Sequence, residues 1–145
     1  MAKAANTVGF KQVVIEVDSL LEKLILTTDT QYYKRASVLL FHPKPEKYIT
    51  GSYIKIGFFR NDHDLAFQDE IHGYLFQQVE KTLDLLLTKY LIASISYDVL
   101  HRKETFPIPV AALREALLNA VIHKDYGSFN PIQISVYSNK IMIFF

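Results

Sequence analysis

Cysteine is absent from this sequence, and no apolar run is longer than five residues. Without cysteine the chain can form neither a disulfide nor a thiolate metal site, which suits a reducing cytosol. The longest apolar runs, at residues 38–41 and 141–145, are far shorter than the roughly 20 residues of a membrane-spanning helix. Residues 1–3 do not begin the apolar segment of a secretory signal. We therefore expect a soluble, cytoplasmic protein that does not enter a membrane.

The chain also has almost no net charge, because it contains 16 basic and 15 acidic residues and its formal charge is +1. A chain without a positive field is not drawn to nucleic acid as a whole, so we expect no DNA binding by this chain itself. The phosphate loop Gly-x-x-x-x-Gly-Lys-Ser/Thr is missing as well, and this excludes the motor of a P-loop helicase.

Apolar residues make up half of the chain, enough for a real core. Helical spacing predicts helices near residues 19–25, 32–40, 70–92 and 110–122, the first of them opened by a Ser19-x-x-Glu22 capping box. A run rich in β-branched and aromatic residues, followed by a polar turn, predicts a hairpin over 53–68, and alternation predicts a second hairpin over 132–143 and a strand over 93–99. We predict an α+β fold in which helices pack on a mixed, largely antiparallel sheet.

The helix at 110–122 carries the only constellation with clear chemistry. Its apolar residues share a wide arc, and Glu115, Asn119 and His123 follow one another at i+4 steps on the other side. Ala112 and Ala116 leave room beside this polar ridge. A carboxylate, a carboxamide and an imidazole facing one space could activate water, complete the shell of Mg²⁺ and contact a phosphate. The alternative, a merely solvated helix face, stays open from spacing alone.

The residues around this helix resemble a known family. The stretch ALREALLNAVIHKDY at 112–126 resembles the signature ALREALLNAVIHRDY of the RecG-related ("ATP-dependent DNA helicase RecG-related") bacterial transcriptional regulators, with Lys124 in place of the usual arginine. The resemblance extends through residues 36–41, 53–60, 69–73 and 89–97, and so covers nearly the whole chain from about residue 20.

Within it, the run Glu115-x-x-x-Asn119-Ala120-x-x-His123 resembles the N box of GHKL ATPases. The resemblance implies that Glu115 is the catalytic base or orients water, that Asn119 holds Mg²⁺ against the phosphates of ATP, and that His123 and Lys124 lie near the nucleotide. It also implies that residues 1–106 are the middle region of such a regulator and that residues 107–145 begin an incomplete GHKL-like (Bergerat-type) ATP-binding module.

The function implied is nucleotide sensing or slow ATP hydrolysis, coupled to DNA binding by domains outside this chain. The resemblance implies a Schlafen AlbA-like domain upstream and a helix-turn-helix downstream, so we expect an internal fragment that carries no bound cofactor by itself. Whether the longer protein is an ATPase stays open. The rival interpretation is a non-catalytic adaptor that links or dimerises DNA-binding domains. The bare apolar strand at 140–145 also favours pairing between copies into a homo-oligomer.

Arg114 is the exception on the apolar side of the same helix. A bare charge there would be costly, so we expect either a carboxylate partner, with Asp69 or Glu70 as candidates, or an escape of the guanidinium to the rim of the core.

Overall fold

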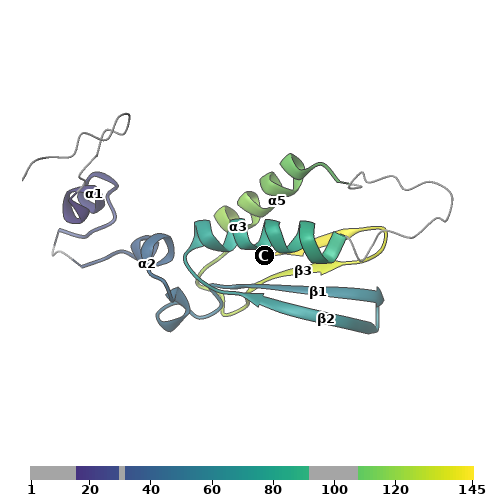
Figure 1. The fold of residues 1–145 in the computed structure, drawn as a ribbon. Helices are drawn as coiled ribbons and strands as arrows, with labels where there is room; N and C mark the ends of the chain where they lie inside the picture. Colours follow the sequence, from purple (N-terminus) through teal and green to yellow (C-terminus); the bar gives the residue numbers. More distant parts are fainter. Residues whose placement is uncertain (1–15, 30–31, 92–107) are drawn as a thin grey trace, which may run out of the picture.

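The computed structural model describes residues 16–29, 32–91 and 108–145 and forms two layers (Figure 1). A four-stranded sheet in the order β2-β1-β3-β4 makes one layer, and helices α3 and α5 lie along one face of it. The strands are β1 (Ile54–Asn61), β2 (Asp64–Ile71), β3 (Ile132–Val136) and β4 (Ile141–Phe144). β1 is antiparallel to β2 and parallel to β3, and β3 is antiparallel to β4. The α+β class with a mixed sheet is therefore confirmed.

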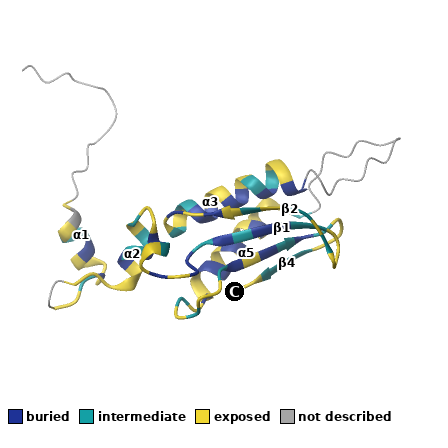
Figure 2. Ribbon diagram, turned by 90° about the horizontal axis from the view of Figure 1, so that it is seen from below, coloured by how far each residue is buried: buried dark blue, intermediate teal, exposed yellow. Residues whose placement is uncertain are grey.

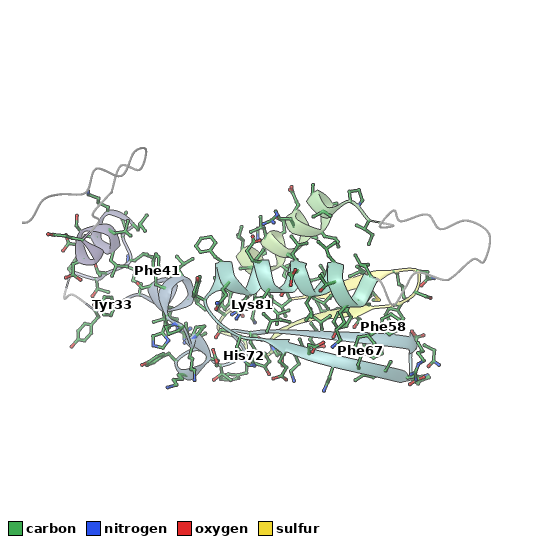
Figure 3. All side chains as sticks on the ribbon, viewed as in Figure 1. Tyr33, Phe41, Phe58, Phe67, His72 and Lys81 are labelled. Carbon is green, nitrogen blue, oxygen red and sulfur yellow. The ribbon has the colours of Figure 1, made fainter. Side chains whose placement is uncertain are left out.

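The strand register separates the two faces of the sheet. Because side chains alternate along a strand, the rows that cross the sheet also alternate between faces. One set of rows carries the core and faces the helices: Ile71–Ile54–Ile132, Asp69–Ile56–Ile134–Ile143 and Phe67–Phe58–Val136–Ile141. The rings of Phe58 and Phe67 stack on each other with their centroids 5.2 Å apart (Figure 3), and the Phe67 ring lies tilted against that of Tyr90 at 5.1 Å.

The helical layer consists of α3 (Leu75–Leu85), its continuation as a wider π-helical turn η2 (Leu86–Tyr90), and α5 (Val110–His123). Both helices bury one side against the sheet, through Val79, Leu83 and Leu86 on one and Leu113 and Leu117 on the other. Pro109 directly precedes α5, where its fixed φ suits a helix start.

Residues 16–29 and 32–48 extend beyond the sheet as α1 (Val17–Lys23), α2 (Arg35–Phe41) and the 3₁₀ turn η1 (Pro45–Lys47), with α1 farthest from the sheet (Figure 1). The hydroxyl of Ser37 donates to the carbonyl of Leu26 at 2.5 Å, which ties α2 to the end of the α1 segment.

Three predicted boundaries are wrong. Helix α1 begins at Val17 and makes no side-chain cap, so Ser19 lies inside its first turn instead of opening it. Helix α2 begins at Arg35, since Tyr33 bridges to Thr27 in an extended pair. The long helix begins at Leu75 rather than at residue 70, because β2 continues to Ile71 and the turn at Gly73 has a φ of 122°.

The sheet joins elements from both sides of the division expected at residues 106 and 107, since β3 pairs with β1 in one sheet and α5 packs beside α3 over one core. The strand predicted at 93–99 lies outside the described residues. Among the helices of the described ranges, none has the length and apolarity needed to cross a membrane.

Candidate functional site

Helix α5 presents the predicted ridge to solvent. Leu113, Leu117, Ala120 and Val121 anchor the helix in the core, whereas Glu115, Asn119 and His123 are all exposed on the side away from the sheet. The apolar arc is narrower than predicted, because Leu118 and Ile122 are 37% and 69% exposed. The ridge therefore lies beside apolar surface that is also open to solvent.

The three ridge side chains are unengaged. Within residues 16–29, 32–91 and 108–145, none of Glu115, Asn119 and His123 makes a side-chain hydrogen bond or ion pair. Ala112 and Ala116 place only methyl groups beside them, so a ligand could approach the backbone of α5 closely. The arrangement offers an oxygen acceptor, a carboxamide and an imidazole on a helix whose other side is fixed by the core.

Lys124, predicted to lie near a nucleotide, is instead one of the buried charged residues, with 7% of its surface exposed. Its ammonium donates to the carbonyl of Asn130 at 2.5 Å and to that of Asp125 at 3.3 Å, and lies 5.3 Å from the Tyr126 ring. Burial lowers the pKa of this ammonium. Lys124 therefore connects the C-terminal end of α5 to the loop that follows, and its ammonium points to carbonyl groups rather than to the ridge.

Two further contacts fix the loop at 125–131. The hydroxyl of Tyr126 donates to the carbonyl of Val121 at 2.9 Å, and burial raises the pKa of this hydroxyl to about 12. Gly51 has a φ of 77°, and a Cβ at this position would lie 2.5 Å from the carbonyl oxygen of Phe129. The loop at 125–131 is thus packed against the segment that leads into β1.

Arg114 links the two helices of the layer. Its guanidinium makes a two-pronged ion pair with Glu80 of α3 and is 44% exposed. The guanidinium lies at the rim of the core and has a carboxylate partner, so both expected outcomes are found. The partner is Glu80, however, and the candidates Asp69 and Glu70 are wrong. Those two carboxylates are engaged elsewhere, on Lys89 and Lys55 respectively.

A polar cluster that the sequence did not indicate lies between β2 and the π-helical turn, around the buried Tyr90. The hydroxyl of Tyr90, which is fully buried, lies 2.7 Å from Asp69 Oδ2 and 3.0 Å from the carbonyl oxygen of Ile56. Lys89 Nζ reaches the same carboxylate oxygen at 2.6 Å and sits 4.9 Å from the Phe67 ring. The hydrogen bond from Lys89, and to a lesser extent that from Tyr90, holds the pKa of Asp69 below its usual range. The pKa of Tyr90 is raised, mainly by burial and secondly by its hydrogen bond to Asp69.

A shallow cleft of about 440 Å³ lies elsewhere, between β2 and α3, and is lined by Glu70, Ile71, His72, Lys81, Asp84 and Leu85. Figure 3 places His72 at the end of the hairpin and Lys81 on α3. His72 stacks on Tyr53 and lies 3.4 Å from Glu46 and 3.5 Å from Glu70. These contacts join η1 to the hairpin, and they involve none of the ridge residues.

No protein-family model matches this chain, and neither a curated protein nor a solved structure does.

Proposed function

We propose that the exposed ridge of α5 is one wall of a Mg²⁺-ATP site. The observation that supports this most strongly is that Glu115, Asn119 and His123 are exposed together and without a partner among the described residues, on a helix held by the core. Solvated helix faces usually carry lysine, glutamate and arginine, and an asparagine in mid-helix costs helix stability, so a function for Asn119 explains its presence better than solvation does.

The residues fit a Mg²⁺ ion that is bound mainly by phosphates. Among the described residues no three His, Cys, Asp or Glu side chains converge as a metal cage. Mg²⁺ at nucleotide sites commonly needs only one or two protein oxygens, with phosphates and water completing its shell. The Asn119 carboxamide oxygen supplies one such ligand, and the ion would neutralise phosphate charge. Glu115, one helical turn earlier, would hold an attacking water, and His123, one turn later, would contact a phosphate.

The chain would work as part of a longer protein. In this proposal a following segment closes over the nucleotide, and binding or slow hydrolysis changes the arrangement of DNA-binding domains outside residues 1–145. The chain would therefore be a nucleotide-sensing region of a RecG-related transcriptional regulator, and the cytoplasm would be its place of action.

Calorimetric titration of Mg²⁺ with a non-hydrolysable ATP analogue tests this on the chain and on the longer protein. Asn119→Ala should abolish binding, and Gln133→Ala, which removes an exposed carboxamide from the opposite face of the sheet, should leave it intact. Glu115→Gln should keep binding and remove any hydrolysis. Binding without turnover in the unaltered protein would favour sensing alone, and the absence of binding in every protein tested would contradict the proposal.

A non-catalytic adaptor is the second candidate, and β4 is the observation that favours it. Among the described strands it pairs only with β3, and it consists of Ile141, Met142, Ile143 and Phe144, without a charge to discourage further pairing. An adaptor would leave Asn119→Ala without effect on nucleotide binding and on any regulatory output.

A further inference from the structure

Residues 16–29 and 32–48 form an arm that extends from one end of the sheet, with α1 farthest from the sheet and α2 nearer to it (Figure 1). Three leucines of the arm are buried, Leu21, Leu26 and Leu39, but none of them belongs to the core between the sheet and the helices. Most residues of the arm are exposed (Figure 2). Its two helices have seven residues each, about half of the length at which an isolated helix becomes stable in water. The arm therefore receives little support from the rest of the described chain.

Charge divides the arm into two halves. Residues 16–29 carry four carboxylates and one cation, a net charge of −3: Glu16, Asp18, Glu22 and Asp29 against Lys23. Residues 32–48 carry four cations and one carboxylate, a net charge of +3: Lys34, Arg35, Lys44 and Lys47 against Glu46. All of these side chains except Glu46 are exposed, and only Glu46, which faces His72, has an ion-pair partner among the described residues. The arm is thus neutral as a whole but presents an unmatched acidic half and an unmatched basic half.

The junction between the two halves is apolar. Tyr33 bridges to Thr27 there, and Ile25, Tyr32 and Tyr33 are 70%, 74% and 63% exposed. Ile25 has a φ of 55°, at a position after a helix where glycine is usual and a β-branched residue is rare. The arm therefore keeps an exposed isoleucine at a local cost in backbone strain.

A surface whose halves have opposite signs is complementary to a rotated copy of itself. A two-fold axis through the junction sets the acidic half of each arm against the basic half of the other. A polyanion such as nucleic acid would be attracted by the basic half but repelled by the acidic half beside it. An apolar centre rich in tyrosine, with charged residues around it, is also the usual composition of a protein–protein interface.

We propose that two copies of the chain bind through their arms, antiparallel about a two-fold axis that crosses the junction at Ile25, Tyr32 and Tyr33. In this dimer α1 of each copy lies against the segment from α2 to η1 of the other. The arm shares no residue with the ridge of α5 or with β4, so the dimer stands or falls independently of nucleotide binding and of strand pairing.

The exposed apolar area of the arm is sufficient for such a contact. Six large apolar side chains are between 47% and 74% exposed: Leu24, Ile25, Tyr32, Tyr33, Phe41 and Tyr48. At about 200 Å² for a whole side chain, their exposed parts amount to roughly 700 Å² per copy. A standard interface buries about 800 Å² per partner, with its polar rim included. The contact covers only the part of this area that faces the partner, so we expect a dissociation constant on the order of micromolar.

Sedimentation equilibrium at protein concentrations up to several hundred micromolar measures the dimer. Glu22→Lys and Arg35→Glu should each weaken it about tenfold, because the symmetry repeats each reversal twice and the altered half keeps a net charge of only −1 or +1. An equimolar mixture of the two variants should dimerise more tightly than either alone, since the mixed dimer retains one contact between a −3 half and a +3 half. Lys81→Glu, exposed on α3, is the matched control and should dimerise like the unaltered chain.

Ile25→Gly separates loss of the interface from loss of the fold. Glycine adopts a left-handed φ without strain, so the urea midpoint, measured at a concentration where the chain is monomeric, should stay the same or rise. The dimer should weaken about tenfold, because the variant removes apolar surface from both copies at the two-fold axis.

A chain that is monomeric at every concentration would overturn the proposal, and so would a dimer that Glu22→Lys, Arg35→Glu and Ile25→Gly leave unchanged. A mixture of the two charge variants that associates no better than either alone would contradict the two-fold pairing of the halves. A monomer that binds a single-stranded oligonucleotide, and binds it less well after Arg35→Glu, would assign the basic half to a polyanion instead.

Discussion

Tyr90→Phe separates the contribution of the Asp69–Lys89–Tyr90 cluster from that of the packing around it, because the substitution removes one oxygen atom and keeps the ring. The hydroxyl that this substitution removes donates a hydrogen bond to the Asp69 carboxylate at 2.7 Å and lies 3.0 Å from the carbonyl oxygen of Ile56. A hydrogen bond to a charged group contributes about 1.5–3 kcal/mol. Asp69 keeps its contact with Lys89 in the variant, so we expect a loss of about 2 kcal/mol in the free energy of unfolding.

Urea unfolding at pH 7, followed by circular dichroism, measures this loss. With a urea dependence of about 2 kcal/mol per molar, the midpoint should fall by about 1 M. Tyr33→Phe is the control, because Tyr33 is 63% exposed, and its midpoint should not move. Equal midpoints for Tyr90→Phe and the unaltered chain would show that the cluster adds nothing to stability.

The pH dependence gives the same reasoning a second test. The pKa of Asp69 is lowered in the folded state, so its contribution is present above the ordinary carboxylate pKa and is lost as the pH falls through the lowered value. Since Tyr90 is one cause of that lowering, the difference between Tyr90→Phe and the unaltered chain should shrink as the pH falls below about 4. A difference that grows in acid would refute the assignment.

Three further substitutions test other parts of the account. Lys124→Met keeps the aliphatic stem but leaves the part-buried carbonyl groups of Asp125 and Asn130 without their donor, so the free energy of unfolding should fall by about 1–3 kcal/mol in a urea titration. Gly51→Ala must adopt a left-handed φ against the carbonyl of Phe129 and should cost about 2 kcal/mol or more, seen as a lower melting temperature. Arg114→Met removes only a solvent-exposed ion pair, and we expect an unchanged urea midpoint; a clear drop would show that the link between α3 and α5 matters more than its exposure suggests.

Much of the fold could be predicted because periodicity is a strong local signal. The β-branched and aromatic residues of Tyr53–Phe59 predicted the β1–β2 hairpin, and the i, i+3, i+4 spacing from Leu75 predicted most of α3. Boundaries failed where tertiary pairing outweighed local pattern. Residues 70 and 71 were included in the predicted helix, but they complete the ladder with β1, and the helix α3 begins only at Leu75.

Some features of the candidate site could likewise be predicted from the sequence, and others could not. The exposure of Glu115, Asn119 and His123 follows from their helical spacing, which fixes their common side once the opposite side is buried. The position of Lys124 did not follow, because it depends on the path of the 125–131 loop, whose carbonyl groups receive its ammonium. The Asp69–Tyr90 contact joins residues 21 positions apart through a π-helical turn, and spacing alone carries no signal for such a pair.

The central claim, that the exposed side of α5 binds a nucleotide, is tested most directly by amide NMR of the labelled protein titrated with Mg²⁺ and a non-hydrolysable ATP analogue. The account predicts Mg²⁺-dependent shifts that centre on Ala112, Glu115, Ala116 and Asn119 and disappear in Asn119→Ala. Shifts confined to the β2–α3 cleft around His72, or none along α5 in the longest form of the protein, would contradict it.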